Sequence, residues 1–104
     1  MNLILARIQA QARQQAIRVT YHAQVEMDDE LIILDEVLEA IANGQILEDY
    51  PDHKRGACCL LHGHTCKGRP LHIVCTTAHT LLVIITVYMP FPPKWISSTQ
   101  RRQQ

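Results

Sequence analysis

Thiol and imidazole groups are concentrated in one short stretch of this 104-residue sequence. The stretch from residue 58 to residue 79 holds all four cysteines and most of the histidines. These residues are Cys58, Cys59, His62, His64, Cys66, His72, Cys75 and His79. Such side chains transfer protons, attack electrophiles and bind metals. The stretch therefore suggests three kinds of chemistry: acid–base catalysis, nucleophilic catalysis and metal binding.

His72 is the best catalytic candidate in this stretch. It lies in the segment GRPLHIVC, where Leu71, Ile73 and Val74 indicate a buried strand. A buried imidazole must find a hydrogen-bond partner for its ring nitrogens. We expect His72 to face the helices as a neutral structural residue, bonded to a backbone carbonyl or to a carboxylate of residues 26–52. The alternative is a position on the open side of the sheet, which would favour a functional site.

A metal-independent ribonuclease needs a base for the 2′-hydroxyl, a cation for the phosphate and an acid for the leaving oxygen. The sequence offers His72 as base or acid and Arg69 as a bidentate phosphate clamp. Tyr88 and His22 can donate protons or orient the substrate. Each has a structural alternative, and for His22 it is packing at the start of a helix that Thr20 caps.

Substrate binding is assigned to three residues outside this catalytic set, Lys67, Lys94 and Trp95. The two lysines would contact phosphate, and Trp95 would stack on a base. For Trp95 the structural alternative is a lid over the edge of the core, because it follows a run of prolines.

A metal site is the alternative use of the thiols and imidazoles, with Cys59, His62, His64 and Cys66 as weak candidates. The sequence has no Cys-x-x-Cys pair and no helical histidine pair at i and i+4. We therefore expect no metal and no cofactor. Cys59 and Cys75 fit small core residues on strands, and a Cys59 nucleophile activated by His72 is a further alternative.

The charges are unevenly distributed although the formal net charge is zero. All ten acidic residues lie between Glu26 and Asp52, and none follows His53. The second half of the chain is therefore a candidate surface for a polyanion such as RNA. The alternative is that the acidic segment folds back and neutralises it.

Hydrophobic periodicity predicts helices followed by strands. The expected helices cover residues 2–18, 22–30 and 34–43, and the expected strands cover 45–50, 57–62, 70–76 and 81–88. Short gaps between the strands indicate antiparallel hairpins, with the last strand inside the sheet. The prediction is an α+β fold of two layers, with N-terminal helices packed on a four-stranded antiparallel sheet. We divide the chain into an amphipathic helix (1–19), one α+β domain (20–96) and a polar tail (97–104).

The relative orientation of His72 and Tyr88 depends on strand register. Hairpin spacing pairs Cys59 with His72 and Arg69 with Tyr88. On that register Tyr88 points to the face opposite His72, and a slip of one residue reverses this.

Several short segments, taken in order, resemble one bacterial family. They are His22-Ala23 with Glu26-Met27, NGQILEDYP at 43–51, CLLHG at 59–63, GRPLHIV at 68–74, IITVYMP at 84–90, and Trp95. The set resembles the domain-of-unknown-function family 4258 (DUF4258), which is grouped with RelE/ParE-like toxins. The resemblance implies cleavage of messenger RNA on the ribosome or inhibition of gyrase. The chain departs from the toxin pattern in two ways. Its sequence pI is near 7.0, whereas such toxins are usually basic, and it carries Glu26 and Glu30 beside the His-Ala motif.

Two further function classes stay open. The neutral charge and the helix at residues 2–18 also fit a non-catalytic module, a degenerate toxin whose partner is an antitoxin or another protein. A small metal-binding domain is the third possibility. We expect a cytoplasmic protein without a signal peptide or membrane span.

Overall fold

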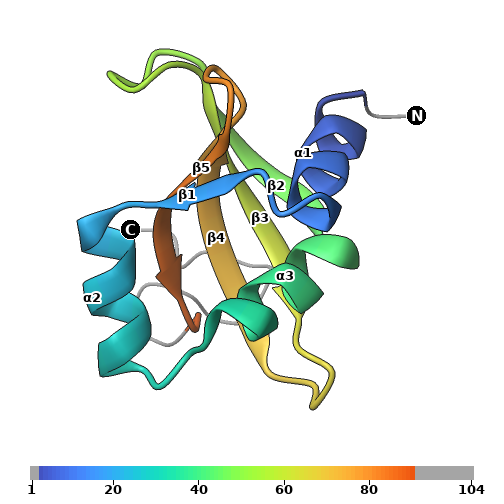
Figure 1. Cartoon of the computed structure of the whole chain (residues 1–104), viewed down its shortest axis with the longest axis vertical. Helices are drawn as coiled ribbons and strands as arrows, with labels where there is room; N and C mark the ends of the chain where they lie inside the picture. The colour runs from blue at the N-terminus through green and yellow to red at the C-terminus, as the bar shows by residue number, and fades with distance from the viewer. Residues whose placement is uncertain (1–2, 91–104) are drawn as a thin grey trace, which may run out of the picture.

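The computed structural model describes residues 3–90 of the chain (Figure 1). Its elements are α1 (Leu3–Arg13), β1 (Ile17–Val19), α2 (Tyr21–Asp29), α3 (Leu34–Ala42), β2 (Gln45–Tyr50), β3 (Cys58–His64), β4 (Pro70–Thr76) and β5 (Leu82–Tyr88). The strands form one sheet in the order β1-β5-β4-β3-β2. The helices pack on one face of this sheet (Figure 1). The predicted α+β fold of two layers is confirmed.

The sheet has five strands and is mixed, so the prediction of four antiparallel strands is wrong in one respect. The predicted helix over 2–18 ends at Arg13, because Gln15 adopts a left-handed conformation with φ 55°. Ile17–Val19 then forms β1, which runs parallel to β5. A short stretch with two β-branched residues favours a strand. The antiparallel hairpins from β2 to β5 are confirmed, and β5 lies inside the sheet between β4 and β1.

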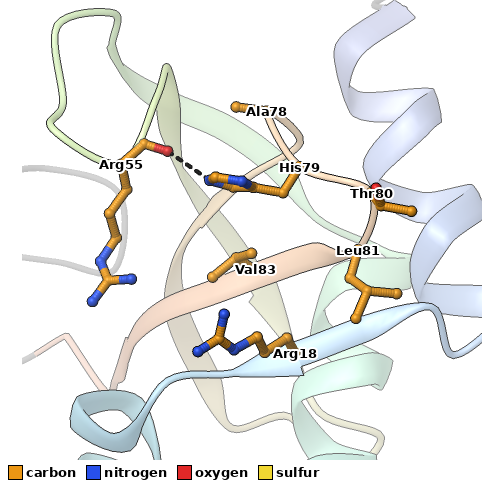
Figure 2. Close-up of a pocket in the computed structure, with 7 residues that line it drawn as sticks. All are labelled: Arg18, Arg55, Ala78, His79, Thr80, Leu81 and Val83. Carbon is orange, nitrogen blue, oxygen red and sulfur yellow. Dashed lines mark hydrogen bonds between the residues drawn. The ribbon is translucent and has the colours of Figure 1, made fainter.

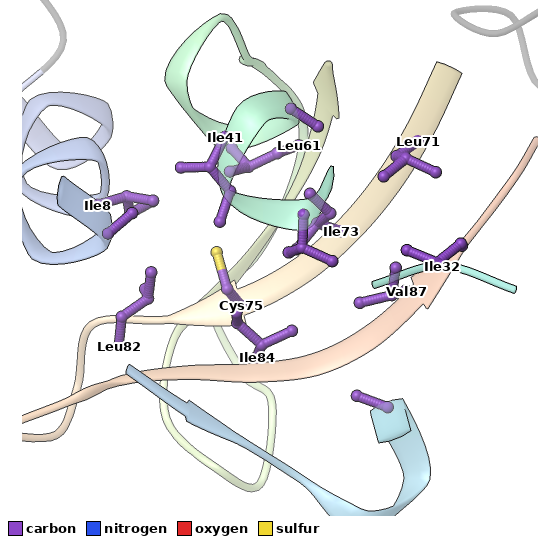
Figure 3. Packing of buried hydrophobic residues seen from close by; sticks show 14 of the residues in the cluster. Ile8, Ile32, Ile41, Leu61, Leu71, Ile73, Cys75, Leu82, Ile84 and Val87 are labelled. Carbon is purple, nitrogen blue, oxygen red and sulfur yellow. The ribbon is translucent and has the colours of Figure 1, made fainter. Parts of the chain in front are cut away.

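The main core lies between the helices and one face of the sheet, which we call the helix-side face (Figure 3). Its sheet residues are apolar and include Leu61, Leu71, Ile73, Cys75, Leu82, Ile84 and Val87. Helix α3 approaches β3 so closely that a Cβ on Gly63 would lie 1.9 Å from the carbonyl oxygen of Ala40. Asn43 fixes this contact, since its side chain donates to the His64 carbonyl and accepts from the His64 amide.

Helix α2 lies beside the part of β5 that β1 leaves unpaired. Thr20 caps the helix, as the sequence predicts, by accepting a hydrogen bond from the Ala23 amide at 3.1 Å. Glu26 accepts from the Val87 amide and Glu30 from the Met89 amide. These carboxylates satisfy donors that an exposed strand edge would leave open. The two glutamates that depart from a basic toxin surface therefore have a structural role here.

A bulge in β5 determines which side chains share a face. The β4–β5 register shifts between Val74 and Cys75, so that Cys75 faces Ile84 while Val74 faces Thr86. After this shift His72 pairs directly with Tyr88, and on the other side His72 pairs with His62. The predicted pair of Cys59 with His72 is wrong, because β3 and β4 pair regularly as far as His64 and Pro70 and so place Cys59 opposite Cys75. The predicted pair of Arg69 with Tyr88 is wrong, because Thr76 pairs with Val83 and the bulge then adds one residue to β5. The sequence does not encode this bulge in any pattern that period-two alternation can reveal.

Candidate active site on the sheet face opposite the helices

His62, His72 and Tyr88 lie side by side on the face that points away from the helices, which we call the second face. Each comes from a different strand, β3, β4 and β5. The expectation that His72 faces the helices is wrong, because its neighbours Leu71 and Ile73 belong to the helix-side core and alternate with it along β4. Cys59 lies on the helix-side face, so the alternative in which His72 activates Cys59 is also wrong.

The three rings are in contact. The Nδ1 atom of His72 lies 3.2 Å from the Tyr88 hydroxyl oxygen, at hydrogen-bond distance. The ring centroids of His62 and His72 are 5.7 Å apart in an edge-to-face arrangement. His64 continues the row, with its ring centroid 4.8 Å from that of His62. The second face thus holds a line of imidazole and phenol groups, the side-chain types that serve as general acids and bases in enzymes.

His62 and His72 differ in how deeply they are buried. His72 exposes 0% of its surface and His62 exposes 9%. The Nε2 atom of His62 is enclosed and has no hydrogen-bond partner among residues 3–90. Burial lowers the pKa of His62 below its ordinary value, and the neighbouring His64 lowers that pKa further. His62 is therefore a neutral imidazole at pH 7, and its Nε2 is not accessible to a substrate in this conformation.

Arg69 does not join this cluster. It points toward the helix layer, where its Nη2 donates to the Glu30 carbonyl at 2.7 Å and its Nη1 to the Leu31 carbonyl at 3.1 Å. Its Nη1 also lies 3.4 Å from a Glu36 carboxylate oxygen. These bonds use the guanidinium to hold the loop between α2 and α3 against β4.

The remaining predicted site residues are not brought to His72 either. His22 is exposed on α2 and lies 3.3 Å from the Glu26 carboxylate. Lys67 is exposed in the turn between β3 and β4. Lys94 and Trp95 lie outside the described residues.

A basic pocket that the site prediction missed opens at the other end of the second face (Figure 2). It has a volume of about 570 Å³, and its polar lining comes mainly from Arg18, Arg55 and His79. Figure 2 shows Arg55 and His79 above Val83 and Arg18 below it. Within residues 3–90, neither arginine forms an ion pair with a carboxylate. Arg55 and His79 lie in the second half of the sequence, whose lack of acidic residues indicates a surface for polyanions. Arg18 lies outside that half, and only the parallel pairing of β1 with β5 brings it to the pocket.

The pocket and the imidazole row lie on one strand. Val83, which lines the pocket, stands near the start of β5, and Tyr88 ends it. At about 3.3 Å per residue the two sites are roughly 15 Å apart.

The weak metal candidates are split between the two faces. Cys59 belongs to the helix-side core, and Cys66 lies in an exposed turn where its amide donates to Glu39. In the described part of the chain no three histidine, cysteine or acidic side chains are placed to hold a metal ion.

Comparison with known proteins gives a family. The model of a domain of unknown function, DUF4258, matches residues 19–89. The chain belongs to the DUF4258 family. No curated protein and no solved structure matches it significantly. The DUF4258 match starts at the last residue of β1 and ends just after β5, so it contains the imidazole row and all of the basic pocket except Arg18. A common origin of this DUF4258 chain with RelE/ParE toxins stays a prediction.

Among residues 3–90, none of the helices has the length and apolar character that a transmembrane span needs.

Proposed function

We propose that this DUF4258 protein binds RNA along the second face of its sheet and cleaves it without a metal ion, as a toxin-related ribonuclease. One observation carries the proposal: three neighbouring strands each bring a proton-transferring side chain to one point, on the face that also holds an unpaired arginine pocket. The charges point the same way, because arginines bind phosphate in the geometry that a nucleic-acid backbone offers.

The chemistry needs two proton transfers. The proposal requires that RNA binding opens the second face at His62, whose Nε2 is enclosed in this structure. Neutral His62 then takes the proton from the 2′-hydroxyl, whose oxygen attacks the adjacent phosphorus. The bond from phosphorus to the 5′-oxygen breaks, and Tyr88 gives its phenolic proton to that oxygen. The products are a 2′,3′-cyclic phosphate and a 5′-hydroxyl. His72 is enclosed, so it acts as a positioning residue that holds the Tyr88 hydroxyl through its hydrogen bond.

The test separates binding from cleavage on a short single-stranded RNA in the presence of a chelator. We expect His62→Gln and Tyr88→Phe to keep RNA affinity and to lower the cleavage rate by about 10²–10⁴-fold. Arg18→Gln and Arg55→Gln should weaken binding and reduce its salt slope by about one each. His22→Gln, exposed on α2, is the matched control and should change neither. Full cleavage by Tyr88→Phe, or no cleavage by the wild type, would contradict the proposal.

A non-catalytic protein-interaction module is the second candidate, and the burial of His72 favours it. An imidazole that exposes none of its surface cannot touch a substrate in this conformation. On this hypothesis His62→Gln and Tyr88→Phe change only the stability of the protein. Induction of the wild-type protein in a bacterium then leaves growth normal. A stoichiometric protein partner in a pull-down, whose binding does not weaken between 50 and 200 mM salt, would support it over RNA cleavage.

A further inference from the structure

Cys59 and Cys75 form a thiol pair in the helix-side core, independent of the second face. They are directly opposite each other in the antiparallel register of β3 and β4. Directly opposed residues in such a pair have Cα atoms about 4.5–5.5 Å apart, which lies inside the range that disulfides require. Figure 3 shows the Cys75 sulfur pointing toward the helix layer. The backbone therefore already has the geometry of a bridge, although both cysteines are reduced.

A cavity gives one of the two thiols access to small molecules. It has a volume of about 360 Å³, and three thiols line it, those of Cys58, Cys59 and Cys75. Asp49, Pro51 and Ala57 also line it and are exposed, so the cavity reaches the surface. Cys59 exposes 4% of its surface and Cys75 exposes 0%. Within the pair, Cys59 is therefore the thiol that an entering molecule reaches more easily.

The electrostatics of the pair distinguish the two sulfurs. A hydrogen bond from the Cys75 thiol lowers the pKa of Cys59 below its ordinary value. The same bond, together with burial, raises the pKa of Cys75. Since the thiolate is the reactive form, Cys59 is the nucleophile and Cys75 keeps its proton.

We propose that Cys59 is a site of oxidation by small hydroperoxides and that Cys75 converts the product to an intramolecular disulfide between β3 and β4. The Cys59 thiolate attacks the peroxide oxygen, the O–O bond breaks, and hydroxide or alkoxide leaves. This yields a sulfenic acid. The Cys75 sulfur then attacks the Cys59 sulfur, the S–O bond breaks, and the thiol proton leaves with the hydroxyl as water. The peroxide is reduced by two electrons, and the two thiols are oxidised to one disulfide.

The other two thiols do not compete for this reaction. Cys58 also lines the cavity, but its side chain packs against Val83 and Ile85 and its thiol donates to the Gly56 carbonyl. Burial raises its pKa. Cys66 is exposed, and a hydrogen bond to Glu39 raises its pKa. A disulfide between the adjacent Cys58 and Cys59 would be strained.

The experiment uses the folded protein with a Cys66→Ser substitution, which removes the exposed thiol and prevents intermolecular disulfides. Hydrogen peroxide is added in steps, remaining thiols are alkylated under denaturing conditions, and peptides are mapped by mass spectrometry without reduction. We expect a linked peptide pair joining Cys59 to Cys75, with Cys58 fully alkylated. The linked pair should weigh less than its two peptides by two hydrogen atoms, and a reductant should separate them.

Two variants keep the proposal open to refutation. Cys75→Ser should leave Cys59 as a sulfenic acid, which a dimedone probe captures, while Cys59→Ser should take up no probe at Cys75. Full alkylation of Cys59 and Cys75 after peroxide treatment, in a protein whose circular dichroism shows it folded, would overturn the proposal. A link through Cys58 would overturn it as well. RNA binding enters none of these measurements, so their outcome is separate from that of the proposed function.

Discussion

The two faces of the sheet are built from the same strands and differ in almost every other respect. On the helix-side face, Leu61, Ile73 and Val87 form an apolar row across β3, β4 and β5. One residue further along the strands, the second-face row consists of His62, His72 and Tyr88. Alternation along each strand places the two rows back to back. The helix-side row belongs to the main hydrophobic core, whereas the second-face row holds polar groups that are expensive to bury without partners.

The difference shows that burial alone does not distinguish core from site in this protein. Ile73 and His72 are both fully enclosed, yet one is surrounded by methyl groups and the other by ring nitrogens and a hydroxyl. Ile73 and His72 differ in the chemistry of their neighbours. Matched substitutions on the two faces test whether this difference changes the stability of the fold.

The largest contrast is expected from truncating adjacent residues of β4. Ile73→Ala leaves a cavity in the main core and should lower the free energy of unfolding by about 4 kcal/mol. Val74→Ala, at a half-buried position of the second face, should lower it by about 1 kcal/mol. Urea unfolding followed by circular dichroism measures both. Equal losses would show that the second face contributes as much packing energy as the helix-side face.

A slightly smaller effect is expected where α3 meets β3. Gly63→Ala places a Cβ 1.9 Å from the Ala40 carbonyl oxygen, which is backbone and cannot rotate away. The helix must shift, and we expect a loss of about 3 kcal/mol. Gly68→Ala is the control, because its φ of 84° costs about 1 kcal/mol but no atom lies within 4 Å of the added Cβ. If both substitutions cost the same, the close approach of α3 does not limit the fold.

Much of the fold can be predicted from the sequence, because the signals are local. The stripe of Val37 and Ile41 identifies α3, and β2 and β4 have the predicted bounds. Strand β1 was missed because three residues, Ile17–Val19, give too short a pattern to outweigh the helical periodicity before them.

The candidate site was predictable in its residue types but not in its assembly. His72 and Tyr88 were singled out, yet their contact depends on a bulge that adds one residue to β5. His62 entered only as a weak metal candidate, because its enclosed Nε2 is a property of the folded sheet. Arg69 was chosen as a phosphate clamp, and no pattern in the sequence shows that backbone carbonyls occupy its guanidinium.

Arginines on the two faces should respond differently to removal of their charge. Arg69→Gln loses bonds to the Glu30 and Leu31 carbonyls and the Glu36 carboxylate, and we expect a loss of about 2 kcal/mol in the free energy of unfolding. Arg55→Gln, in the basic pocket, should change stability by less than about 0.5 kcal/mol. Thermal unfolding of both variants under one buffer condition tests this. A large stability loss in Arg55→Gln would show that the pocket is structural.

The smallest effect concerns the pH dependence that the second face adds to folding. Burial and His64 hold the pKa of His62 below its ordinary value, whereas in the unfolded chain it returns to about 6.5. Below that pH the unfolded state binds more protons at this position than the folded state, so stability is complete above pH 6.5 and declines as the pH falls toward the lowered pKa. The slope from one histidine cannot exceed about 1.4 kcal/mol per pH unit. We expect His62→Gln to flatten the decline below pH about 6.5 in urea titrations. Identical slopes in the wild type and His62→Gln would mean that the enclosed imidazole is protonated as easily in the fold as in the unfolded chain, and the second face would then be open to water at His62.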